Sequence, residues 1–398
     1  MYPIRFENVY YEKIWGGRDL EAFRNNLPSG DIGESWDVAC HPNGTGVVAN
    51  GELKGKRFDE IIREFGHALV GSKVSIEKFP LLVKLINSRE KLSVQVHPGD
   101  EYAQRVENQF GKTEAWYVVD AKPGAKLIVG TKNCDKEVFA KAIEEGRSED
   151  YLNVVDVKKG DCFLINSGLV HAICEGLIIA EIQQNSDVTY RVYDYGRPRE
   201  IHVEKSLEVI DFNLKAENLS NKEVVKFDGF SKVDFCENEY FGMQKFNIET
   251  EWADCSNEEK FFILTCVDGC GTIEGCGTIE SDRVVEGNGI VEIGRISRQA
   301  NAVVDNDGIG RQDGGGVDDG IVESDGTFKN DGTFKEDGTI RQATVVVDSY
   351  GADGQDAEAV SKQGFCEEIK IGDSYLIPAT LGKYVVKGNL AIIKSYPM

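Results

Sequence analysis

Short apolar runs, separated by turn residues, follow one another along most of the chain. Runs of four to eight apolar residues bounded by Gly, Pro, Asn or Asp are typical of β-strands. Many such strands at regular spacing indicate antiparallel sandwiches or barrels. The sequence therefore predicts a mainly β protein, with strands in 80–87, 114–120, 125–130, 161–166, 177–184, 261–269 and 373–379.

Helical patterns are few. Residues 58–65 (FDEIIREF) and 134–146 (CDKEVFAKAIEEG) place apolar residues at intervals of three and four, which predicts two amphipathic helices. Asp135 precedes the second apolar pattern and is expected to cap that helix.

One supersecondary pattern occurs twice. The stretch 157–173 (VKKGDCFLINSGLVHAI) aligns without gaps with 369–386 (IKIGDSYLIPATLGKYVV), and His171 falls opposite Lys383. This similarity predicts two related β-domains of cupin-like jelly-roll type, residues 1–220 and 221–398. If His171 has a special role, the second copy has lost it.

Residues 275–363 differ from the rest of the chain. They contain 16 Gly and 12 Asp, with 18 acidic and 8 basic residues, and no Pro or Trp. Asp-Gly turns alternate with short β-prone pieces in DGTFKNDGTFKEDGTIRQ. We interpret the segment as an insertion into a hairpin loop of the second domain, either disordered or built of irregular hairpins. The ligand periods of known calcium loops are absent from it.

Composition narrows the function classes. The chain has 398 residues and a formal net charge of −23, which argues against nucleic-acid or anionic-membrane partners. No apolar run reaches the ~18 residues of a membrane span, and the N-terminus does not resemble a signal peptide. The scattered cysteines are expected to be free thiols, which favours a cytoplasmic protein. We also predict a monomer or weak homodimer.

Chemistry is concentrated around two of the five histidines. In SVQVHP, Gln95 and His97 alternate with valines and therefore share one face of a strand that Pro98 ends, with His97 as its last residue. Glu114 opens the strand EAWYVVD, with Lys112 two residues earlier, and His171 ends a predicted hairpin. In a small barrel these inward side chains converge.

Two imidazoles, a carboxylate and an amide oxygen suit Zn²⁺, with Mn²⁺ or Fe²⁺ as competitors. So few thiol ligands favour a site that keeps an open position over a closed structural one. From spacing alone, two unrelated hydrogen-bonded histidines remain an equal alternative.

Four stretches of the sequence carry a resemblance to a known family. GDCFLINSGLVHAI resembles the second cupin motif, with Asn166 where Pro is usual. Together with FPLLVKLINSREKLSVQVHPGDEYA, FGKTEAWYVV and EIQQNSDVTYRVYDYGR, it resembles type I phosphomannose isomerase in its short bacterial form. The resemblance runs from 15 to about 215, resumes on both sides of 275–363, and does not cover that segment.

The resemblance implies a zinc-dependent interconversion of mannose 6-phosphate and fructose 6-phosphate through an enediol. It implies one Zn²⁺ per chain, held by Gln95, His97, Glu114 and His171. It implies four catalytic residues, Arg191, Lys112, Glu181 and Lys84. It also implies two substrate-binding residues, Ser93 and Arg197. Arg197 stands where some members have Lys. The proton-transfer group stays open between Glu181, Lys112 and a metal-bound water.

The sequence fits two other functions less well. A non-catalytic sugar-sensing cupin is expected to lose Arg191, Lys112 or a ligand, and the sequence keeps them all. Another metal-dependent cupin enzyme, such as an oxygenase, more readily has His-x-His in its first motif than Gln95 and His97. An isomerase is therefore the main prediction.

Overall fold

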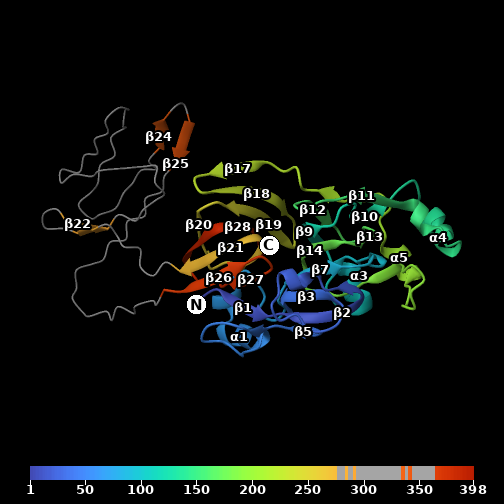
Figure 1. The fold of residues 1–398 in the computed structure, drawn as a ribbon, viewed down its shortest axis with the longest axis horizontal. Helices are drawn as coiled ribbons and strands as arrows, with labels where there is room; N and C mark the ends of the chain where they lie inside the picture. Colours follow the sequence, from blue (N-terminus) through green and yellow to red (C-terminus); the bar gives the residue numbers. More distant parts are fainter. Residues whose placement is uncertain (276–282, 286–289, 293–332, 337–338, 343–363) are drawn as a thin grey trace. The chain divides into compact units, whose positions relative to one another are not determined.

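The computed structural model describes residues 1–275, 283–285, 290–292, 333–336, 339–342 and 364–398. The chain forms two compact units, Met1–Cys276 with Gly364–Met398, and Gly277–Gln363. The first unit is mainly β (Figure 1). It contains His97, Glu114 and His171, three of the predicted metal ligands. The predicted fold class is confirmed, and the division near residue 220 stays a prediction.

Two antiparallel sheets of the first unit face each other across an apolar core, as in a jelly roll. One has seven strands, in the order β16 (Glu217–Asn218), β12 (Cys162–Ile165), β9 (Glu114–Ala121), β14 (Leu177–Gln184), β7 (Leu81–Ser88), β3 (Ile32–Val38) and β2 (Val9–Gly17). The other has five, in the order β11 (Leu152–Asp156), β10 (Lys126–Thr131), β13 (His171–Ile173), β8 (Val94–Val96) and β15 (Tyr190–Tyr193). Trp116 and Ile86 from the first sheet pack with Leu127 and Ile173 from the second.

A third sheet packs against the outer face of the seven-stranded sheet, where Val83 and Leu164 meet Ile4 and Ile263. Its main path is β17 (Val224–Phe227), β18 (Phe230–Glu237), β19 (Phe241–Ile248), β28 (Lys383–Pro397), β21 (Phe262–Gly275), β27 (Ser374–Ile377), β1 (Ile4–Glu7) and β6 (Val47–Val48). Two more strands pair off this path, β20 (Glu251–Cys255) with β28 and β26 (Cys366–Lys370) with β21. Since β1 pairs with β27, the N-terminal strand belongs to the sheet built mostly by the C-terminal part.

Both predicted helices are present. They are α1 (Phe58–Phe65) and α4 (Lys136–Glu144), and the Asp135 side chain caps α4 by accepting from the Val138 amide. The remaining helical segments in the described part of the chain are short: α2 (His67–Val70), α3 (Asp100–Glu107), α5 (Val203–Val209), and the 3₁₀ turns η1 (Asp19–Ala22) and η2 (Ser148–Tyr151). Phe139 of α4 contributes to a core on the outer face of the five-stranded sheet. No helix among the described residues is long and apolar enough to cross a membrane.

The repeated sequence pattern forms the same turn twice. Gly160 and Gly372 adopt positive φ values of 92° and 90°, a region that glycine enters without strain. The Asp that follows each of them accepts a hydrogen bond from a backbone amide three residues earlier, in Lys158 and Lys370 respectively. Each turn leads into a strand, β12 or β27.

The segment 275–363 joins two paired strands, because β21 and β26 are antiparallel up to Glu274 opposite Cys366. Within it the backbone of β22 (Arg283–Val285) pairs with β23 (Ile290–Glu292), and β24 (Thr333–Glu336) pairs with β25 (Thr339–Gln342). The other residues of the predicted insertion lie outside the described residues. A small hairpin, β4 (Cys40–His41) with β5 (Gly44–Thr45), completes the first unit.

Candidate metal centre and active site

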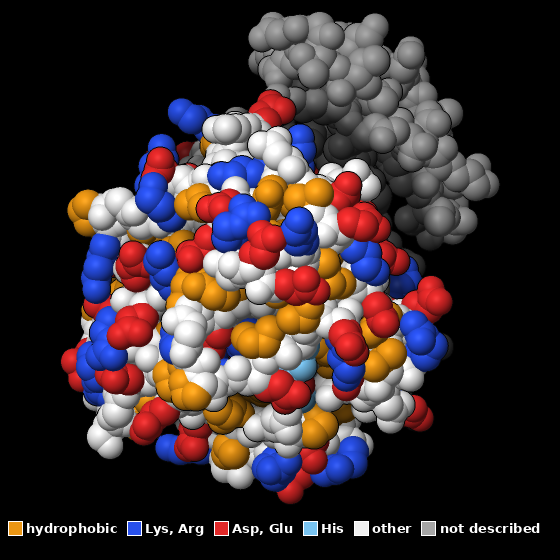
Figure 2. All heavy atoms as spheres, turned by 90° about the vertical axis from the view of Figure 1, so that its right-hand side faces the viewer, with side chains coloured by type: hydrophobic (Ala, Val, Ile, Leu, Met, Phe, Trp, Pro, Cys, Tyr) orange, Lys and Arg blue, Asp and Glu red, His pale blue; other side chains and the backbone are white. Residues whose placement is uncertain are grey.

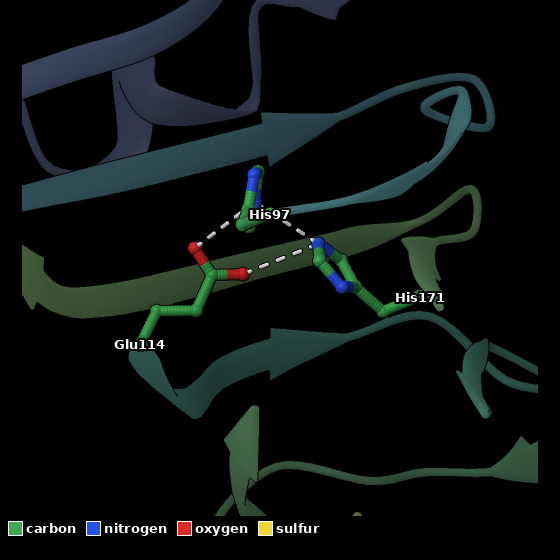
Figure 3. A group of neighbouring side chains, drawn as sticks. All are labelled: His97, Glu114 and His171. Carbon is green, nitrogen blue, oxygen red and sulfur yellow. Dashed lines mark hydrogen bonds and ion pairs between the residues drawn. The ribbon is translucent and has the colours of Figure 1, made fainter. Parts of the chain in front are cut away.

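Both sheets of the jelly roll contribute to one buried polar cluster. On the five-stranded sheet, Gln95 of β8 lies directly opposite His171 of β13, so their side chains leave the same face. His97 follows one residue after β8, which ends at Val96 rather than at His97 as predicted. Glu114 opens β9 on the facing seven-stranded sheet and points across the core toward both imidazoles (Figure 3).

The distances within the cluster suit one shared cation. The Nε2 atoms of His97 and His171 are 3.2 Å apart. Glu114 Oε2 is 3.6 Å from His97 Nε2, and Glu114 Oε1 is 3.5 Å from His171 Nε2. The terminal amide nitrogen of Gln95 is 3.3 Å from His171 Nε2. The predicted convergence of the four side chains is present in the structure, and their role as ligands stays a proposal.

Hydrogen bonds fix the orientation of both imidazole rings. His97 Nδ1 lies 2.8 Å from the Val188 carbonyl, and His171 Nδ1 lies 2.8 Å from the Leu169 carbonyl. Because a carbonyl oxygen only accepts, each Nδ1 carries the proton and each Nε2 presents a lone pair to the centre. Burial lowers the pKa of His171 to about 4 and also lowers the pKa of His97. Both rings are therefore neutral, the form that binds metals.

The carboxylate of the cluster also fits a cation. Glu114 is fully buried, and its Oε1 atom has no hydrogen-bond partner among the described residues. Burial and the neighbouring Glu181 carboxylate raise the pKa of Glu114. Two imidazole lone pairs and this carboxylate oxygen face one another at short range, an arrangement that is unfavourable unless a cation lies between them. Among the described residues, His97, Glu114 and His171 form a group able to hold a metal ion.

A line of alternating charges continues from the cluster into the seven-stranded sheet. Lys112 Nζ lies 2.7 Å from Glu114 Oε2, 3.0 Å from His97 Nε2 and 3.9 Å from Glu181 Oε1. Lys84 Nζ lies 3.0 Å from Glu181 Oε1, because β7 and β14 pair these two residues directly. The structure therefore brings Lys112, Glu181 and Lys84 together with the predicted metal ligands.

The electrostatics of this line favour the charged forms of Lys84 and Glu181. Burial works against the charged form of Lys84, but Glu181 and Glu34 outweigh it and raise its pKa. Burial likewise works against ionised Glu181, but Lys84 and Lys112 lower its pKa overall. An unpaired lysine buried inside a strand would be costly, and the pairing of Lys84 with Glu181 avoids that cost.

Sequence reasoning missed two members of the line. Trp116 donates its indole N–H to Glu181 Oε2 at 2.8 Å and packs edge-on against the His171 ring. Glu34 lies 3.8 Å from Lys84 Nζ and accepts from Trp36 Nε1 at 2.8 Å. The available signal for Glu34 was a charged residue within the apolar stretch IGESWDV.

The remaining predicted residues lie along β8 and β15. Arg191 is directly opposite Gln95, on the side of β8 away from His171, so the three side chains share one face. Arg191 Nη1 donates to the Glu200 carbonyl at 2.8 Å. Ser93 is 3% exposed and two residues before Gln95. Arg197 donates to the Lys91 carbonyl at 2.8 Å, which holds it beside the segment that leads to Ser93.

Glu34 is expected to make the protein sensitive to acid. Burial would raise the pKa of Glu34, but Lys84 and Lys13 outweigh it and lower the pKa to about 2. Because the unfolded chain binds this proton more readily, the stabilisation is complete above the unfolded pKa of about 4.5 and is lost as pH falls toward 2. Between pH 5 and 3 the wild type should lose about 2 kcal/mol more unfolding free energy than Glu34→Gln.

Urea unfolding at the two pH values measures this difference. Glu249→Gln, at an exposed position, is the control and should lose as much stability as the wild type. Equal losses in the wild type and Glu34→Gln would show that the Glu34–Lys84 contact does not stabilise the folded state.

Fold and site together define a cupin-type protein with a buried candidate metal site, and comparisons with known proteins identify its family. Residues 4–126 match phosphomannose isomerase type I, catalytic domain. The chain is 40% identical over 255 residues to the probable mannose-6-phosphate isomerase GmuF of Bacillus subtilis, covering 62% of this chain and 80% of the relative. It is 38% identical over 277 residues to mannose-6-phosphate isomerase ManA of the same species, covering 68% and 86%.

Solved structures give the same result. The crystal structure of mannose 6-phosphate isomerase from Bacillus subtilis superposes with a TM-score of 0.72 at 28% identity, covering 99% of each chain. A putative mannosephosphate isomerase from Archaeoglobus fulgidus has a TM-score of 0.62 at 18% identity, covering 100% of this chain and 98% of its own, and shares the fold. The chain belongs to the type I phosphomannose isomerase family.

Proposed function

We propose that this protein interconverts D-mannose 6-phosphate and D-fructose 6-phosphate by proton transfer through an enediol. The observation that carries the proposal is the buried cluster of His97, Glu114 and His171, with Arg191 one strand beyond Gln95. An aldose–ketose isomerase needs an acid–base group, an electrophile for the developing oxyanion, and an anchor for phosphate. This cluster and its neighbours supply candidates for all three.

We propose Zn²⁺, one per chain, as the metal, with Gln95, His97, Glu114 and His171 as its ligands. Neutral imidazoles and a carboxylate are common zinc ligands, and the amide orientation of Gln95 that presents Oε1 completes the set. When bound, the metal supplies a Lewis acid that polarises substrate oxygens. The carbonyl contacts of the two imidazoles hold their Nε2 atoms toward the site beforehand.

Lys112 is proposed to accept the proton from one substrate carbon as a neutral amine and to return it to the neighbouring carbon as an ammonium. Its Nζ touches both Glu114 and His97, so it is the cationic group nearest the ligand cluster in the described part of the chain. Glu181 already forms an ion pair with Lys84 and accepts a hydrogen bond from Trp116. We therefore propose that Glu181, which Lys84 and Trp116 hold in place, attracts Lys112 and fixes its position.

Arg191 is proposed to stabilise the enediolate, because a guanidinium is permanently charged and donates in a fixed fork. Ser93 and Arg197 are proposed to bind the phosphate. The protein is strongly acidic overall, and acidic and basic side chains alternate over the face in Figure 2. A dianionic substrate therefore depends on local cations rather than on the net charge.

We keep the two-domain division as a proposal, with residues 1–220 as the metal-binding cupin domain and 221–398 as a second domain without metal ligands. Lys383, which stands opposite His171 in the repeated pattern, is exposed, whereas His171 is buried. We also propose a cytoplasmic monomer or weak homodimer whose partner is the sugar phosphate alone.

Deleting residues 277–363 is expected to leave the isomerase rate within about threefold of the wild type. All of the proposed site residues precede residue 220, and the strands on either side of the segment already pair at Glu274 and Cys366. The measurement is turnover by the deletion variant, with circular dichroism to verify its fold. A folded variant without activity would show that the segment takes part in the reaction.

The proposed function is tested by a coupled assay on mannose 6-phosphate, with and without a chelator. Turnover that the chelator abolishes and Zn²⁺ restores is expected. No turnover in any condition would overturn the isomerase proposal, whereas full turnover of metal-free protein would overturn the metal proposal alone.

A further inference from the structure

A buried carboxylate organises two arginines next to the metal-site candidates. Asp194 follows β15 and is 1% exposed. Arg199 donates two hydrogen bonds to it, from Nε to Oδ2 at 2.7 Å and from Nη2 to Oδ1 at 2.6 Å. Arg197 Nε donates to Asp194 Oδ1 at 3.0 Å. Charge-assisted forks of this kind fix both the position and the direction of a guanidinium.

The backbone holds the same arrangement. The Arg197 amide donates to the Asp194 carbonyl at 3.0 Å, and the Arg197 guanidinium lies over the Tyr195 ring at 5.4 Å from its centroid. Tyr195 adopts a positive φ of 55°, a conformation uncommon for a tyrosine. Between Asp194 and Arg199 the chain is therefore wound tightly around one carboxylate.

This group of residues adjoins the proposed reaction site. Arg191 lies three residues before Asp194 and opposite Gln95. Its Nε atom is buried and has no hydrogen-bond partner in the part of the chain that the structure describes. Burial and the charge of Arg199 lower the pKa of Arg191.

The local charge is unbalanced. Arg197 and Arg199 bond to the buried carboxylate of Asp194, and Arg191 lies three residues before it. These three guanidinium groups and one carboxylate carry an excess of two positive charges. The nearby Glu200 contributes its carbonyl to Arg191, while its side chain is 83% exposed and lies toward His202. A phosphate dianion matches this excess and relieves the repulsion between the arginines.

We propose that Asp194 is a positioning residue that holds Arg197 and Arg199 beside Arg191, and that Arg199 is thereby a third arginine of the phosphate cradle. The proposal rests on the proposed function, because it takes the phosphate of the sugar phosphate as the ligand. It adds Asp194 and Arg199, to which neither the sequence pattern nor the family resemblance above assigned a role.

Asp194→Asn keeps the shape of the side chain and removes the charge that orients both arginines. We expect KM for mannose 6-phosphate to rise at least ~10-fold while kcat changes less than ~3-fold, because phosphate binding is weakened and the reacting carbons are not touched. Arg199→Gln, at a side chain that is 25% exposed, is expected to raise KM in the same way without risk to the core. A fall in kcat at unchanged KM in both variants would overturn the proposal.

The matched control is Asp37→Asn. Asp37 is also a buried carboxylate, 2% exposed, and it accepts a hydrogen bond from Arg24 at 2.6 Å. It lies in β3 of the seven-stranded sheet, on the face away from Glu114. This variant should lose thermal stability at unchanged KM. A rise in KM equal to that of Asp194→Asn would mean that general loosening, and not arginine placement, explains the result.

Calorimetric titration with inorganic phosphate separates this proposal from the proposed function, since it requires no turnover. The wild type should bind phosphate at least ~10-fold more tightly than folded Asp194→Asn or Arg199→Gln. Equal phosphate affinity in all three proteins would overturn the cradle even if the wild type is an active isomerase. Loss of affinity in the variants would uphold it even if mannose 6-phosphate is not turned over.

Discussion

Replacing His171 with alanine is expected to lower kcat/KM for mannose 6-phosphate by at least ~10³-fold. The substitution removes one of the two imidazole nitrogens that face Glu114 inside the core. It also removes the ring that lies 3.3 Å from the Gln95 amide, so the surroundings of a second proposed ligand change at the same time. The measurement is the coupled assay together with the metal content of the purified protein, expected to fall from one equivalent to almost none.

His67→Ala is the matched control, since His67 lies in α2 and bonds only to the Gly71 carbonyl within the described part of the chain. This variant should keep both its metal and its activity. If His171→Ala keeps one equivalent of zinc and near-normal turnover, the cluster is not the metal centre.

Replacing Arg191 with lysine or alanine is expected to lower kcat by ~10²-fold or more, while the bound metal is retained. The residue shares a face with Gln95 but contacts the metal-site candidates only through the sheet, so the ligands stay in place. Lysine should rescue little, because a point charge on a flexible stem does not reproduce a guanidinium fork. The measurement is steady-state turnover at saturating substrate, with metal content determined on the same sample.

Arg63→Ala serves as a control for loss of an arginine, because Arg63 is a surface residue 69% exposed in α1. Its kcat should equal that of the wild type. Unchanged kcat in Arg191→Ala, or loss of zinc from that variant, would contradict the role proposed for Arg191.

Much of the fold follows from local patterns. Each predicted strand, from 80–87 to 373–379, overlaps a strand of the structure, since alternation and turn residues are local signals. The two strongest helical patterns became α1 and α4. The short helices α3 and α5 carry few apolar residues and pack over the five-stranded sheet, so tertiary contacts rather than propensity stabilise them.

The candidate site was predictable where chemistry and strand alternation coincide. Gln95, His97 and Lys112 stand out because polar residues interrupt buried strands or precede them. Partners supplied by strand pairing could not be found in this way. Trp116 meets Glu181 across 65 residues of sequence, and Asp194 is an ordinary turn residue until the fold surrounds it with arginines.

The central claim is that one buried metal centre performs the isomerisation. Its most direct test is to strip the protein of metal and add Zn²⁺ in steps while measuring both bound zinc and turnover of mannose 6-phosphate. We expect turnover to rise linearly with bound zinc and to reach its maximum at one equivalent per chain. Full turnover by the metal-free protein, or turnover that does not follow bound zinc, would contradict the claim.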